Sequence, residues 1–392
     1  MKQKFSIVIP TFNRSRFLGR LLQYYKEVSL PSLIVVADSS CGDQLEKNRR
    51  FIKRARGVLN IRHDEYTSQM NFSLKIAQSL TNLESEYVGM CGDDDFITPR
   101  AIEKCVKFLE QNPEYTIVHG RAIRVVCVTK SSRSSGMRIV PSTYRQRSID
   151  DEKSQVRLKR HLADYTPTFY SIHHLKNLQH DIKIATNHFL DNINRTKDNA
   201  SDYHFYELLL SCLSLIQGKS KCLDMLYMVR QVHPNSTARG SRLWPDLLTS
   251  DDFSLQYAQF RDALADALIG VSRLTKIEAI ETVNRAFLLY FAKSLYKRVY
   301  NSDWASTGSM NGQNNFEHTL IRFRQIAEYF FTMGRTLLRD LKLFRDPMDK
   351  MFMSVDRKLS LKTLLNPESS FFADFIPIYD HVVRYPTGID SP

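Results

Sequence analysis

The first 120 residues alternate short apolar runs with stretches in which apolar side chains recur every three or four positions. The apolar runs predict buried strands at residues 5–10, 33–37, 58–62 and 87–91. The periodic stretches predict helices at residues 16–25, 70–80 and 99–109, the last headed by Pro99. Regular alternation of this kind predicts a mainly parallel sheet with helices on both faces, so the expected fold class is α/β.

The pattern changes along the rest of the chain. A further strand is predicted at residues 121–128, followed by a serine-rich loop at 131–136. From about Trp244 onward, helical periodicity dominates and strand signals are few. We therefore expect two domains, an α/β domain at residues 1–240 and a mostly α-helical C-terminal region at residues 241–392.

Polar residues follow three of the predicted strands, at residues 11–14, 38–40 and 92–96. In a sheet of this type the carboxyl ends of the strands meet at one edge, and ligands bind there. The three polar segments therefore predict a binding site at this edge.

Composition narrows the class of protein. The 392 residues are 43% hydrophobic and carry a formal net charge of +13. A basic surplus suits plain solubility, a phosphorylated substrate or an anionic membrane face. Nucleic acid is the weakest of the candidate partners, because the chain carries no nucleic-acid-binding motif. We therefore expect no nucleic-acid partner.

Cysteine usage and hydropathy indicate a compartment. None of the six cysteines forms a C-x-x-C pair, which favours a reducing environment. There is no signal-peptide pattern at the N-terminus and no uninterrupted apolar stretch of roughly 20 residues. We expect a cytoplasmic protein, with membrane contact only peripheral, at the inner face.

The segment CGDDDF at residues 91–96 places three adjacent carboxylates directly after a predicted strand. Adjacent carboxylates repel one another unless a cation offsets their charge. Mg²⁺ or Mn²⁺, bound by carboxylate and phosphate oxygens, provides that offset. The alternative interpretation is a solvated turn, or a cap in which Asp95 serves the helix headed by Pro99.

Three segments in this order, FSIVIPTFNR, VVADSS and CGDDDFITPRAIEK, resemble family 2 glycosyltransferases of GT-A fold. The resemblance covers residues 4–120 and extends more loosely to about residue 240. It implies transfer of a sugar from a nucleotide-sugar, with Mn²⁺ or Mg²⁺ as cofactor. A UDP-sugar is favoured as donor, and a glycan or lipid-linked acceptor in surface polysaccharide synthesis is expected.

The resemblance also implies roles for single residues. Asp38 would hydrogen-bond the nucleobase, and Asp93 would approach the ribose. Asp94 would bind the metal, with Asp95 assisting or facing the sugar. The other residues assigned to the donor are Thr11, Asn13 and Arg14. Two departures leave roles open: a single acid ends the second strand, and the cluster reads G-D-D-D rather than D-x-D-D.

An inverting transfer needs a base for the acceptor hydroxyl, on the face opposite the leaving group. Asp202 precedes a helical stripe at residues 205–212, where the resemblance places that base. Helix capping would also explain an Asp there. Asp191 and Asp198 are the reserves.

The segment LYMVRQVHPNSTARG resembles the end of the family's catalytic domain. The resemblance implies that His233 completes the metal site and that Arg230 or Arg239 contacts phosphate. A structural histidine is the alternative. No role is expected for His63, His119, His188 or His204.

Two rival functions are weighed against the transferase. A sugar nucleotidyltransferase typically has a glycine-rich loop after the first strand, whereas PTFNRSRF has no glycine. A degenerate scaffold or glycan-binding module would not need the separated polar positions Asp94, Asp202 and His233. A basic amphipathic stripe at residues 320–344 is expected to pack on the protein, or else to contact an anionic bilayer.

Overall fold

The structure is a computed structural model, and it describes residues 3–129, 137–143, 146–195, 204–232, 252–300 and 359–389. Contacts within the chain divide it into two compact units, one of residues 1–286 with 359–392 and one of residues 287–358. The first unit holds the sheet and the candidate site. The predicted domains, 1–240 and 241–392, stay a prediction.

The N-terminal half of the sheet is parallel, with strand order β3-β2-β1-β4. Its strands are β1 (Phe5–Thr11), β2 (Leu33–Asp38), β3 (Ile61–Glu65) and β4 (Tyr87–Met90). The intervening helices are α1 (Ser15–Glu27), α2 (Gly42–Ala55) and α3 (Phe72–Thr81). Both faces of β1 are buried, which explains why it reads as a continuous apolar run rather than an alternating one.

The sheet continues from β4 in the order β8-β6-β9-β5, and β7 pairs with β6. Strands β6 and β9 run parallel, whereas β5, β7 and β8 join antiparallel. The strands are β5 (Phe96–Ile97), β6 (Tyr115–Thr129), β7 (Met137–Thr143), β8 (Ile172–His174) and β9 (Lys219–Val232). The helices of this half are α4 (Pro99–Gln111), α5 (Ser154–Ala163), α6 (Leu175–Arg195) and α7 (His204–Gln217).

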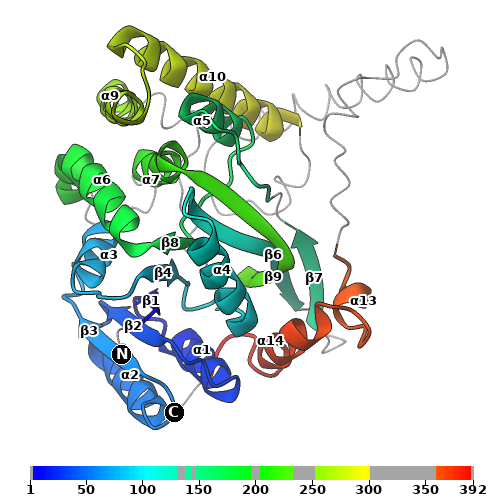
Figure 1. Ribbon diagram of the computed structural model, residues 1–392. Coiled ribbons are helices and arrows are strands. Elements are labelled where there is room, and N and C mark those ends of the chain that lie inside the picture. The colour runs from blue at the N-terminus through cyan, green and yellow to red at the C-terminus, as the bar shows by residue number, and fades with distance from the viewer. Residues whose placement is uncertain are drawn as a thin grey trace, which may run out of the picture. The chain divides into compact units, whose positions relative to one another are not determined.

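The part of the chain described after β9 is helical. It comprises α9 (Phe253–Val271), α10 (Lys276–Tyr300), α13 (Leu361–Leu364) and α14 (Phe372–Arg384). Helix α9 packs against α7, and α14 lies beside α1 (Figure 1). Among the described helices, none has the length and apolar character needed to cross a bilayer.

The predicted fold class is confirmed: a mixed α/β sheet with flanking helices is followed by a helical C-terminal region. One strand is displaced from its prediction. Residues 58–62 were expected to form it, but β3 spans Ile61–Glu65 and Val58 is 53% exposed. The reason is that the chain turns after α2, where the amides of Val58 and Leu59 both donate to the carbonyl of Ala55. The serine-rich loop and the basic stripe at residues 320–344 lie outside the described residues.

Arg157 on α5 fixes the C-terminal end of α7. Its buried guanidinium donates from Nε to the carbonyl of Leu215 at 2.7 Å and from Nη2 to that of Ile216 at 2.8 Å. Its Nη1 donates to two further carbonyls, of Asp151 and Glu152. The last carbonyls of a helix have no partner within the helix, and a cation there also offsets the helix dipole.

We expect Arg157→Met to lower the free energy of unfolding by about 3 kcal/mol, because buried carbonyls lose their donors. Arg160→Met on the same helix is the matched control. Arg160 makes an exposed ion pair with Asp151, so its loss should cost less than about 1 kcal/mol. Urea unfolding of both variants measures the difference, and equal midpoints would show that Arg157 does not hold α7.

Candidate functional site

The exits of β1, β2 and β4 meet at one edge of the sheet, as the sequence predicts. Thr11 at the end of β1 is in register with Asp38 at the end of β2. Val8 of β1 is in register with Met90 of β4, and its carbonyl accepts from the amide of Cys91. The segment that carries the three aspartates therefore begins beside the exit of β1.

Two of the three aspartates are held from the β1 exit. Thr11 Oγ1 donates to Asp93 Oδ2 at 2.8 Å. Arg14 places Nη1 3.2 Å from Asp93 Oδ1 and Nη2 2.5 Å from Asp94 Oδ2. Asp93 is 2% exposed, while the side chain of Asp94 is 13% exposed. Thr11, Arg14, Asp93 and Asp94, all predicted from the sequence, thus form one contact network.

Asp95 is held from β9. Its Oδ2 lies 3.2 Å from Nε of Arg230, and its Oδ1 accepts from the backbone amide of Gln231 at 3.1 Å. The pairing of β5 with β9 brings these groups together, and the Arg230 guanidinium also lies 4.6 Å from the centre of the Tyr170 ring. The N-cap residue of α4 is Thr98, so the alternative in which Asp95 caps that helix is wrong.

The electrostatics of the cluster favour a bound cation. Burial raises the pKa of both Asp93 and Asp95, and the neighbouring Asp94 carboxylate raises them further. Arg14 opposes this for Asp93 and Arg230 opposes it for Asp95. Added positive charge near Asp94 would therefore stabilise the ionised form of all three carboxylates.

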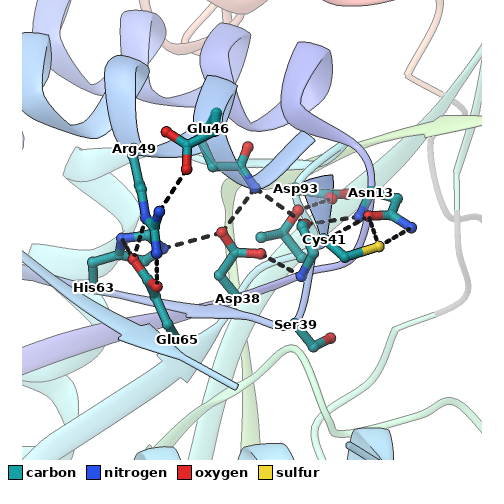
Figure 2. A network of polar contacts seen from close by, with 12 residues as sticks. Asn13, Asp38, Ser39, Cys41, Glu46, Arg49, His63, Glu65 and Asp93 are labelled. Carbon is teal, nitrogen blue, oxygen red and sulfur yellow. Dashed lines mark hydrogen bonds and ion pairs between the residues drawn. The ribbon is translucent and has the colours of Figure 1, made fainter. Parts of the chain in front are cut away.

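Asp38 is buried within a network of protein donors (Figure 2). Its Oδ1 accepts from the Ser40 amide at 2.8 Å, and its Oδ2 lies 2.8 Å from Asn48 Nδ2 and 3.0 Å from His63 Nε2. Burial by itself would raise the pKa of Asp38, but the hydrogen bonds from His63, Ser40 and Asn48 outweigh it and lower the pKa. The carboxylate orders the turn after β2, and its predicted contact with a nucleobase stays a prediction.

Asn13 joins the exits of β1 and β2. Its backbone adopts a left-handed conformation, with φ of 51°, which Asn tolerates better than most residues. Its amide donates to Ser40 Oγ at 2.8 Å, and its Oδ1 accepts from the Cys41 amide at 3.0 Å (Figure 2). Asn13 was assigned to the donor from the sequence, and that contact stays a prediction.

Two residues that were given no role from the sequence contact the strand exits. His63, on β3, donates from Nε2 to Asp38 Oδ2 at 3.0 Å. Lys75, on α3, is buried and donates from Nζ to the Thr11 carbonyl at 2.9 Å and to Ser39 Oγ at 2.8 Å. Burial lowers the pKa of Lys75 to about 8. Lys75 therefore fastens the exit of β1 to the exit of β2.

The first turn of α7 carries a further carboxyl group, that of Glu207. Glu207 in that turn is exposed and accepts from Tyr165 Oη at 3.1 Å. The surrounding protein raises the pKa of its carboxyl, against the lowering influence of Tyr165 and of Arg230, the residue that binds Asp95. Arg230 thus lowers the pKa of two carboxyl groups, those of Glu207 and Asp95.

Several predicted site residues cannot be placed. Asp198, Asp202, His233 and Arg239 lie outside the described residues, and only the backbone of Asp191 is described. Within the described ranges, no group of three His, Cys, Asp or Glu side chains is arranged as metal ligands. The predicted metal set of Asp94, Asp95 and His233 therefore stays a prediction.

Comparison with known proteins bears on this site. The family description "Glycosyl transferase family 2" matches residues 6–174. No curated protein matches the sequence.

Solved structures with a similar chain trace are glycosyltransferases at low identity. S. aureus TarS 1–349 in complex with UDP-GlcNAc is 14% identical, with a TM-score of 0.40 over 75% of this chain and 91% of that one. The mannosyltransferase PcManGT from Pyrobaculum calidifontis, in complex with GDP-Man and Mn²⁺, is 11% identical, with a TM-score of 0.38 over 98% of this chain and 88% of that one.

The family match spans the sheet from β1 to β8 and includes all three strand exits that form the site. Residues 6–174 of this chain therefore match glycosyl transferase family 2.

Proposed function

We propose that this protein is a metal-dependent, inverting glycosyltransferase that moves a sugar from a nucleotide-sugar to a hydroxyl group. The observation that carries the proposal is the cluster of Asp93, Asp94 and Asp95, which is flanked by Arg14 and Arg230 at the sheet edge of a family 2 region. Carboxylates for a divalent cation and guanidinium groups for phosphate are the groups that a departing nucleoside diphosphate requires.

The donor set of the cluster fits Mg²⁺ or Mn²⁺. Asp94 presents a partly exposed carboxylate, whereas both oxygens of Asp95 already accept hydrogen bonds. Mg²⁺ is usually held by one or two carboxylates together with substrate phosphates, so a single accessible carboxylate suffices. Asp94 would hold the ion, with Asp95 and His233 as the further proposed ligands. When bound, the ion would act as a Lewis acid on the leaving diphosphate.

Arg14 and Arg230 are proposed to act on both the carboxylates and the diphosphate. They neutralise buried carboxylates before any donor is present, since Arg14 pairs with Asp93 and Asp94 and Arg230 pairs with Asp95. Guanidinium groups also bind phosphate in the same forked geometry that suits carboxylates. We propose that Arg14 and Arg230 contact the diphosphate.

An aromatic side chain supports a nucleotide donor. Phe12 follows Thr11 at the exit of β1 and is 48% exposed, which is unusual for phenylalanine beside a buried strand. An exposed aromatic ring offers a stacking surface for a nucleobase, worth about 1–3 kcal/mol. The turn built on Asp38 and Asn13 borders the same edge, so a nucleoside is proposed to lie there, with a UDP-sugar favoured.

The remaining elements of the proposal come from the sequence. The acceptor is a glycan or a lipid-linked saccharide in surface polysaccharide synthesis. The enzyme acts in the cytoplasm, and its peripheral membrane contact would use the basic residues at 320–344.

Nucleotide release tests the proposal. We expect one donor among UDP-, GDP-, dTDP- and CMP-sugars to be hydrolysed slowly with Mn²⁺ or Mg²⁺, and not with chelator. Mn²⁺ with the matching free nucleotide should also raise the melting temperature, because ligands that bind only the folded state stabilise it. Failure of both measurements would favour the non-catalytic scaffold. Release that does not depend on metal would overturn the metal assignment but keep the transferase.

A further inference from the structure

Residues 385–389, here called the C-terminal segment, contact two residues that also contact the aspartate cluster. The two residues are Arg20 on α1 and Gln231 on β9. The C-terminal segment follows α14 and lies outside the residues that match the family. Neither of its two links to the cluster has a role in the function proposed above.

Arg20 forms the first link. It is fully buried, with 0% of the residue exposed. Its Nη1 donates to the Tyr385 carbonyl at 2.9 Å and its Nη2 donates to the Asp94 carbonyl at 3.2 Å. The rings of Phe17 and Phe96 lie about the guanidinium, with centres 5.2 and 5.0 Å away. A planar group held in this way sets the position of the backbone at Asp94 relative to the C-terminal segment.

Gln231 forms the second link. Its backbone amide donates to Asp95 Oδ1 at 3.1 Å, and its side-chain Nε2 donates to the Pro386 carbonyl at 2.7 Å. The residue is buried. The C-terminal segment is thereby joined to Asp94 through one residue and to Asp95 through another.

The C-terminal segment is itself fixed to the start of α1. The Ile389 amide donates to the Arg16 carbonyl at 2.9 Å, and Arg16 Nη2 donates to Thr387 Oγ1 at 2.9 Å. Gly388 has a φ of +89°, and a Cβ there would lie 2.4 Å from the backbone of Arg16. Only glycine permits this close approach, so the contact between the C-terminal segment and the Arg16 backbone depends on Gly388.

Helix α14 keeps the segment in place. It packs along α1, where the buried His381 on α14 lies 2.9 Å, through Nε2, from Glu27 Oε2. The ring of His381 also meets the Tyr24 ring edge-on, with centres 5.8 Å apart. The segment is thus held at one end by a packed helix and at the other by Arg16.

We propose that the C-terminal segment is a positioning element for the carboxylates of Asp94 and Asp95. The proposal rests on the transferase function above, in which these carboxylates serve the metal and the diphosphate. Some groups orient metal ligands by hydrogen-bonding to them without touching the metal. Removing such a group typically lowers metal affinity or activity about 10- to 100-fold. Loosening the segment is therefore expected to weaken metal-dependent donor use rather than merely to destabilise the fold.

Two substitutions in the full chain loosen the segment from different ends. Gly388→Ala places a methyl group against the Arg16 backbone. Gln231→Ala removes the contact with Pro386 and keeps the backbone amide that serves Asp95. Gly57→Ala is the matched control, because a Cβ at Gly57 meets no atom within 4 Å.

Two readouts follow for each variant. Hydrogen exchange of peptides that contain residues 92–97 should be faster in Gly388→Ala and Gln231→Ala than in Gly57→Ala. The Mn²⁺ concentration for half-maximal nucleotide release should rise about tenfold in the same two variants. Gly57→Ala should match the wild-type protein in both measurements.

The outcomes separate this proposal from the proposed function. Unchanged exchange at residues 92–97 in both variants overturns the positioning role, whether or not the enzyme is active. A lower melting temperature with unchanged Mn²⁺ dependence would also overturn it, since that result marks a purely structural contact. A wild-type protein that releases no nucleotide counts against the transferase, and the exchange comparison still decides the link. If Gly388→Ala does not fold, Gln231→Ala decides alone.

Discussion

Replacing Asp94 by Asn is expected to lower metal-dependent nucleotide release at least about 100-fold. A Lewis-acid ion lowers the activation barrier by several kcal/mol, and the substitution removes a charged ligand of that ion. The amide has the shape of the carboxylate, and Asp94 is the most exposed of the three aspartates. Arg14 retains its contact with Asp93 in the variant. Folding should therefore be preserved, as a melting temperature close to the wild-type value would show.

Asp64→Asn is the matched control for this experiment. Asp64 is a partly buried aspartate at the end of β3, and its Oδ2 lies 2.8 Å from Nη2 of Arg62. It resembles Asp94 in exposure and in having an arginine partner, but it lies on another strand exit. We expect wild-type release rates from this variant. If Asp94→Asn keeps activity within a few-fold of Asp64→Asn, the metal assignment is wrong.

Asp202→Asn is expected to slow sugar transfer about 10²- to 10⁴-fold, the usual effect of losing a general base, while donor binding is spared. Asp202 precedes α7 in the sequence by two residues. Glu207, in the first turn of α7, and Arg230, which binds Asp95, influence each other electrostatically. The role of Asp202 as the base is proposed from its place in the sequence, just before α7, where the family resemblance locates that base.

Glu207→Gln provides the comparison. Glu207 is exposed and its pKa is raised. If Glu207 is the base, the transfer rate should fall as the pH is lowered, and this fall should begin at a higher pH than for a glutamate with an ordinary pKa. Transfer rates of both variants between pH 5 and 8, with donor affinity measured separately, distinguish the two carboxylates. If Glu207→Gln transfers sugar slowly and Asp202→Asn transfers it at the wild-type rate, Glu207 and not Asp202 is the base.

The order of elements in the first 120 residues could be predicted because β1, β2 and β4 of the parallel half are buried on both faces, whereas the more polar β3 was displaced from its prediction. Such strands read as unbroken apolar runs, and the helices between them read as periodic stripes. Pro99 also begins α4 as predicted. The later strands were harder to predict: β8 has three residues, and β9 pairs with β6 across about 100 residues of chain.

The candidate site was predictable only in part. The aspartates could be found because charged residues directly after a buried strand are conspicuous. Lys75 could not, since lysine is normally read as solvent-facing, and its burial depends on acceptors supplied by Thr11 and Ser39. His63 escaped for a similar reason: its partner Asp38 lies on a neighbouring strand, 25 residues away.

Arg20 escaped because it stands among apolar residues of a predicted helix, where an arginine is expected to reach water. Its burial requires the Tyr385 carbonyl, which is 365 residues away in the sequence. No local pattern signals a contact of that separation. The same is true of Gly388, whose backbone conformation has a purpose only once Arg16 lies against it.

The separation between Arg20 and Tyr385 also bears on how the protein is made. A ribosome adds about 5–20 residues per second, so helix α1 leaves it roughly 20–70 s before residue 385 is added. During that interval the Tyr385 carbonyl is absent, so the Arg20 guanidinium lacks an acceptor that it has in the folded protein. The face of α1 that α14 covers is therefore expected to stay exposed to water and to chaperones until the segment after α14 is synthesised.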